Sequence, residues 1–73
     1  MRQNIDGIPV VEFDLDRVRS KKFIYRIPND LQGTLDVGSK IFVTDNIEYG
    51  IEPFLCVLLE LRDNDTFGLW EKQ

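Results

Sequence analysis

The chain lacks histidine altogether and contains a single cysteine, Cys56. Histidine is the commonest general base and metal ligand near neutral pH, and one thiol can form neither an internal disulfide nor a standard zinc site. The sequence also lacks a phosphate-binding glycine loop, a dinucleotide-binding glycine pattern and a serine with a plausible base partner. We therefore expect no catalytic residue, no metal site and no cofactor, and we do not expect an enzyme.

Long apolar runs are missing as well. No segment approaches the ~20 apolar residues of a membrane span, and the N-terminus lacks the apolar segment of a signal peptide. With a single cysteine, these absences predict a cytoplasmic protein that does not contact a membrane. Cys56 lies in an apolar run between residues 54 and 59, which predicts a small buried hydrophobic side chain rather than a reactive thiol.

A length of 73 residues predicts one domain covering 1–73, with the polar residues 1–7 as a loose tail or an edge segment. A chain this short buries only about 60% of the surface that its unfolded form exposes. Its aromatic and aliphatic residues are sufficient for one core but leave little reserve. A homodimer is therefore one of the alternatives, because association would bury surface that a monomer cannot cover.

Alternation of apolar and polar residues is the main structural pattern, and it predicts five short strands, at 8–15, 22–27, 40–44, 54–61 and 66–71. The fourth segment also has apolar residues at helical spacing. Its length of eight residues, the preceding Pro53 and the following turn residues 62–65 favour a strand. In the segment 22–27, we expect Phe23, Tyr25 and Ile27 to face the core and Ile24 to face outward.

The connections between these strands set the expected fold. Residues 16–21 can form at most one helical turn, and residues 29–39 make a longer excursion that Leu31 and Leu35 attach to the core. Five short strands with one long loop predict an all-β domain. We expect a small five-stranded antiparallel barrel or sandwich of the SH3-like or OB-like size class.

The net charge of −4 is unevenly distributed along the chain. Residues 1–44 hold seven bases and six acids, whereas residues 45–73 hold two bases and seven acids. This asymmetry predicts a basic patch and an acidic face. The basic patch would consist of five residues that fall within ten positions without an acid among them: Arg17, Arg19, Lys21, Lys22 and Arg26.

Three apolar residues are candidates for contacting a protein partner. Ile24 faces outward with no polar role, Tyr49 lies at an expected loop tip, and Trp70 lies near the C-terminus. Trp70 either covers one end of the barrel or anchors a partner, since a partly exposed tryptophan makes a strong interface hot spot. The pair Asp63 and Asp65 resembles the start of a calcium loop, but without the following glycine and distal glutamate it predicts an ordinary hairpin turn.

Residues 11–44 contain two motifs of a known family, namely Phe23-Ile24-Tyr25-x-Ile27-Pro28-x-x-Leu31 and Leu35-x-Val37-Gly38-Ser39-x-Ile41-x-Val43. They resemble the N-terminal 3′-DNA-end-binding domain of the bacterial primosomal replication-restart helicase, and small phage-encoded proteins that look like that domain standing alone. The family has an aspartate, which helps to hold the terminal nucleotide, where this chain has Ile24. The resemblance therefore implies the fold more than the DNA-end binding.

We expect a non-catalytic protein-interaction module: an adaptor, inhibitor or assembly factor, phage- or plasmid-encoded, whose partner is another protein. One alternative is a nucleic-acid-binding module that uses the basic segment 17–26, although the acidic net charge disfavours it. A second alternative is a structural subunit that associates with itself.

Overall fold

The computed structural model describes residues 2–73, and within them the chain folds into strands joined by loops and two short 3-10 turns, without an α-helix. These elements are β1 (Asn4–Ile5), β2 (Ile8–Glu12), η1 (Leu15–Arg17), β3 (Lys22–Arg26), η2 (Asn29–Leu31), β4 (Lys40–Thr44), β5 (Phe54–Arg62) and β6 (Phe67–Lys72). The predicted all-β class is confirmed, and the ambiguous segment 54–61 is a strand. No helix of the described chain is long and apolar enough to cross a membrane.

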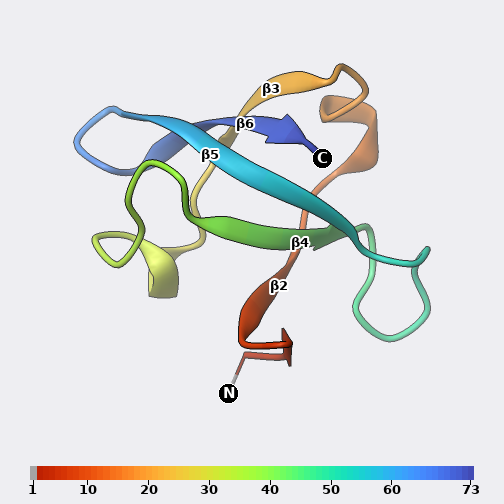
Figure 1. The fold of residues 1–73 in the computed structure, drawn as a ribbon. Coiled ribbons are helices and arrows are strands. Elements are labelled where there is room, and N and C mark those ends of the chain that lie inside the picture. Colours follow the sequence, from red (N-terminus) through yellow and green to blue (C-terminus); the bar gives the residue numbers. More distant parts are fainter. Residues whose placement is uncertain (1) are drawn as a thin grey trace.

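The strands form one strongly bent sheet in the order β1-β2-β4-β5-β6-β3 (Figure 1). All neighbours are antiparallel except β2 and β4, which run parallel, with Val11 beside Val43. The sheet stays open, with β1 at one edge and β3 at the other. The predicted five-stranded antiparallel barrel is thus not what forms. Residues 13–21 do not reverse the chain as a hairpin; they carry it across the molecule to β6, and β4 then returns beside β2.

The inner face of this sheet builds the core. Its buried side chains come from every strand except β1, and they include Val11, Phe23, Ile41, Leu58 and Trp70. Burial of each such side chain contributes on the order of 1.5–3 kcal/mol relative to exposure in water. The predicted faces of β3 are confirmed, because Phe23 and Ile27 are buried, Tyr25 packs against the core and Ile24 is exposed.

The loop between β3 and β4 also follows the prediction. Leu31 and Leu35 are partly buried and pack against the core, as expected. The single helical turn that the sequence allows in residues 16–21 is present as η1, which begins at Leu15, before that segment. Its cap is Asp14, whose carboxylate accepts a hydrogen bond from the N–H of Asp16 at 3.0 Å.

The N-terminal residues 2–7 form the edge of the sheet rather than a loose tail. Asp6 and Gly7 both have left-handed backbone angles, which is the geometry of a tight two-residue hairpin turn between β1 and β2. The guanidinium of Arg2 donates to the carbonyl of Val10 at 2.9 Å and also pairs with the carboxylate of Asp30. Arg2 therefore ties the N-terminal hairpin to η2.

Candidate interaction surface

The hydrogen-bond register of β3 determines which of its groups face solvent. At one end of the strand the N–H of Lys72 donates to the carbonyl of Lys21 at 2.9 Å, and at the other the N–H of Ile27 donates to the carbonyl of Thr66 at 2.9 Å. In an antiparallel ladder the bonded residues alternate, so the odd-numbered residues of β3 bond to β6. The backbone N–H and C=O groups of Lys22, Ile24 and Arg26 therefore point to the open edge.

The same three residues direct their side chains to the outer face of the sheet. Ile24 is 49% exposed and lies opposite Leu69 of β6. Because Ile24 and Leu69 form a non-hydrogen-bonded pair, their side chains lie close together. Phe67 is the next outward residue of β6, and it lies opposite Arg26. Ile24, Leu69 and Phe67 form what we call the outer apolar row.

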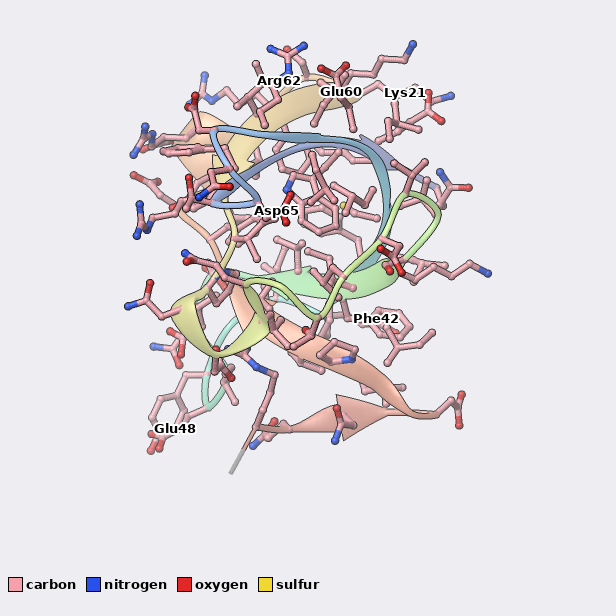
Figure 2. All side chains as sticks on the ribbon, turned by 90° about the vertical axis from the view of Figure 1, so that its left-hand side faces the viewer. Lys21, Phe42, Glu48, Glu60, Arg62 and Asp65 are labelled. Carbon is pink, nitrogen blue, oxygen red and sulfur yellow. The ribbon has the colours of Figure 1, made fainter. Side chains whose placement is uncertain are left out.

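Charged residues of both signs surround the outer apolar row. Lys22 lies opposite Glu71 across β3 and β6, and on β5 Glu60 lies opposite Leu69. Arg62, also on β5, lies opposite Phe67 and forms an ion pair of 3.1 Å with Glu60. The side chains of Glu60 and Arg62 project from the same end of the molecule as that of Lys21 (Figure 2). An apolar centre with a polar rim is the usual composition of a protein-protein contact surface.

Strand order places some bases of the expected basic patch beside acids. Strand β3 pairs with β6, which brings bases of the N-terminal half beside acids of the C-terminal half, as in the pair Lys22 and Glu71. Within the N-terminal half, Arg19 forms an exposed ion pair with Asp16 at 3.1 Å. The distribution of charge along the sequence therefore does not by itself give the distribution on the surface, because strand order brings parts of the two halves together.

All five residues of the basic segment are exposed, but they do not act as one free cluster. The guanidinium of Arg17 lies 5.4 Å from the ring centre of Tyr25, and that of Arg26 lies 5.8 Å from the ring centre of Phe67. Both distances fit cation-π contacts. Lys21 and Lys22 flank the start of β3. Of the five, Arg19 is ion-paired with Asp16, whereas the contacts of Arg17 and Arg26 with neutral rings hold the guanidinium groups against the protein and leave their charge in place.

The three predicted anchor residues lie in different places. Trp70 is fully buried in the core, so its ring is not available to a partner, and the prediction that it anchors a partner is wrong. Tyr49 is 88% exposed in the loop between β4 and β5, at the opposite end of the molecule from β3 (Figure 1). Of the three residues, Ile24 alone belongs to the outer apolar row.

Sequence reasoning passed over Leu69 and Phe67, although a usable signal was present. The alternation in residues 66–71 places Gly68 and Trp70 on one face and Phe67 and Leu69 on the other. Gly68 is buried next to Trp70, and a methyl group at Gly68 would lie 3.0 Å from the indole nitrogen. A glycine beside a tryptophan on one face leaves room for the ring in the core, which leaves the other face for solvent.

Two further features carry no evident chemistry. A broad open depression mixes both charges with apolar groups and is lined by Arg2, Gln3, Glu12, Pro28, Asp30, Asn46, Ile47 and Glu48. The hydrogen bond from Arg2 lowers the pKa of Asp30 below its usual value, as an exposed ion pair does.

Cys56 is buried as predicted, and burial raises the pKa of its thiol to about 11. Residues 2–73 contain no group of three metal-binding side chains.

Comparisons with known proteins do not add to this geometry. No protein-family model, no curated protein and no solved structure matches the chain. The resemblance of residues 11–44 to the primosomal domain therefore stays a prediction, and function has to be argued from the surface itself.

Proposed function

We propose that this chain is a non-catalytic protein-interaction module and that its contact surface is the outer apolar row with its charged rim. The observation that carries the proposal is the exposed side chain of Ile24 (49%) beside the partly exposed Leu69 on the outer face. Neither residue belongs to the core or to the side chains packed against it, and about half of the Ile24 side chain remains open to solvent. Clusters of exposed apolar side chains on a small soluble domain mark contact sites.

The position of the surface supports this function. β3 and β6 are rigidly placed because the inner faces of both strands belong to the core, through Phe23 and Trp70. A partner would therefore meet a preformed surface and would not have to order a loop, which lowers the entropic cost of binding. Burial of the apolar row would supply about 25 cal/mol for each Å² removed from water.

A matched pair of substitutions tests the proposal. Ile24 and Ile51 are the same residue type with nearly equal exposure, 49% and 51%, but Ile51 lies in the loop between β4 and β5. Partners captured with the tagged chain from its natural host would be purified, and their affinities measured by titration calorimetry. We expect Ile24→Lys to weaken binding at least about tenfold, which corresponds to 1.4 kcal/mol, and Ile51→Lys to leave it unchanged.

The reverse result would locate the contact at the loop that carries Tyr49 and would overturn the proposed surface. Two further measurements separate the other functions. Sedimentation velocity shows whether the partner is a second copy of the chain, in which case Ile24→Lys converts a dimer to a monomer. Fluorescence anisotropy with single-stranded and 3′-recessed DNA tests nucleic-acid binding, and salt-sensitive binding that Lys21→Glu/Lys22→Glu abolishes would favour that function instead.

A further inference from the structure

The free edge of β3 is a row of backbone groups that a further strand can pair with. In the sheet β3 neighbours β6 alone, and no strand lies beyond it at the rim of the molecule (Figure 1). The N–H and C=O groups of Lys22, Ile24 and Arg26 point away from β6, as the register of the ladder requires. Exposed edges of this kind accept extended peptides as additional strands.

The charges on this edge oppose pairing between two copies of the chain. Antiparallel pairing of two β3 strands about Ile24 would place Lys22 of one copy opposite Arg26 of the other. Parallel pairing in register would place each base opposite its own equivalent. Like charges directly opposite each other destabilise a strand pair, and charged edge residues are a common protection against aggregation. The edge therefore disfavours a second copy and favours a strand of opposite charge.

We propose that β3 binds an extended acidic segment of a partner protein as an added strand. This inference rests on the proposed function and names the chemistry of the partner. The segment would carry an acidic residue opposite Lys22, an apolar residue opposite Ile24 and an acidic residue opposite Arg26, at positions i, i+2 and i+4. Its apolar side chain would extend the outer apolar row by one strand, and its acids would pair with the two bases.

The other side of the added strand has less room. Side chains at positions i+1 and i+3 would point toward the inner side of the sheet, where the connector after β2 runs. The N–H of Asp14 in that connector donates to the hydroxyl of Tyr25 at 3.0 Å, which holds the connector beside β3. Small side chains therefore suit the intervening positions, and the motif becomes acidic-small-apolar-small-acidic.

A synthetic peptide provides a direct probe. We would use fluorescein-labelled Ser-Thr-Glu-Ser-Val-Ser-Glu-Thr-Ser and measure anisotropy with the full chain at low salt. We expect saturable binding, weakened at least about tenfold by Lys22→Glu/Arg26→Glu and weakened as salt rises. The control Arg19→Glu/Lys40→Glu has the same change of net charge but leaves the edge intact, and it should bind the peptide like the wild type. A peptide with glutamine in place of both glutamates should lose affinity to a similar extent.

Amide hydrogen exchange shows whether the bound peptide lies along the strand. In the free protein the N–H groups of Lys22, Ile24 and Arg26 should exchange fast and those of Phe23 and Tyr25 slowly. Saturating peptide should slow exchange at Ile24 at least about tenfold, as a new hydrogen bond does, and should leave Phe23 unchanged. Ile24→Pro removes the edge donor without touching the ladder to β6, and should abolish binding of the peptide while the chain stays folded.

Three results would overturn the inference: no binding at low salt, equal loss of binding in both double variants, or binding without protection of Ile24. None of these would by itself overturn the proposed function. If the peptide fails but Ile24→Lys still loses its protein partner, the outer face binds that partner without an added strand. If Ile24→Lys leaves every partner bound, the proposed function fails on its own measurement.

Discussion

The ring of Phe13 lies flat against the ring of Tyr25, with centroids 3.9 Å apart and planes inclined by 14°. Phe13 follows β2 and Tyr25 belongs to β3, two strands that are not neighbours in the sheet. The hydroxyl of Tyr25 also accepts a hydrogen bond from the N–H of Asp14 at 3.0 Å. Side chains therefore join the two halves of the bent sheet at a place where no backbone ladder joins them.

Removing the hydroxyl of Tyr25 tests this contact. We expect Tyr25→Phe to lower the free energy of unfolding by about 1 kcal/mol, because the Asp14 N–H loses its acceptor while the ring stack remains. Tyr49→Phe is the matched control, since that ring is almost fully exposed, and it should change stability by less than about 0.5 kcal/mol. Urea unfolding followed by Trp70 fluorescence measures both, and equal stabilities would contradict the role given to Tyr25.

A substitution at Gly68 provides the second test, because Gly68 lies against the indole of Trp70. A methyl group there would meet the Cδ1 atom of Leu58 at 2.7 Å and the indole at 3.0 Å. We expect Gly68→Ala to cost about 1–2 kcal/mol of stability, since the packing strain exceeds the gain from replacing a flexible glycine. Adding Leu58→Val removes the clashing Cδ1. The double variant should then be more stable than the sum of the single effects, and simple additivity would count against the clash.

Cys56 links stability to alkaline pH. Burial raises the pKa of its thiol from the ordinary 9.0 to about 11. The unfolded chain therefore ionises first, so stability is fully present below pH 9 and falls as pH rises from about 9 to about 11. The slope from this group approaches about 1.4 kcal/mol per pH unit. Urea titrations at several pH values should show this loss in the wild type relative to Cys56→Ala, and parallel curves would refute it.

Local pattern predicted the strands but could not predict their order. The alternation in Phe23, Tyr25 and Ile27 identified β3 and its inner face correctly, because a strand with one buried face has an apolar residue at every second position. No local sequence pattern predicts the pairing of β3 with β6. That pairing depends on the path of residues 13–21 and on the stack of Phe13 with Tyr25, both of which are tertiary features. For the same reason, the parallel pairing of β2 with β4 was missed.

The candidate surface was predictable only in part. Ile24 was identified as outward and exposed from the pattern of its own strand. The alternation also marks Leu69 as outward, but that Leu69 and Glu60 lie beside Ile24 could not be predicted, because they come from β6 and β5 and their positions depend on strand order. Trp70 was left between two predictions, covering one end of the barrel or anchoring a partner, and the sequence did not decide between them. Its burial depends on Gly68, which makes room for the ring inside.

The turn between β5 and β6 offers a last test, because its backbone is strained. Asp63, Asn64 and Asp65 have φ angles of 50°, 55° and 67°, in the left-handed region that residues other than glycine, asparagine and aspartate rarely adopt. The turn is closed by hydrogen bonds from the N–H and hydroxyl of Thr66 to the carbonyl of Asp63.

A β-branched side chain at the last of these positions should be costly. We expect Asp65→Val to lower the free energy of unfolding by about 1–2 kcal/mol, because its branched carbon clashes with the backbone at positive φ. Asp65→Asn removes the charge but keeps a side chain that tolerates this geometry, so it should stay close to wild type. Urea unfolding of the two variants separates backbone strain from charge. If both lose the same stability, the carboxylate and not the φ angle matters at this turn.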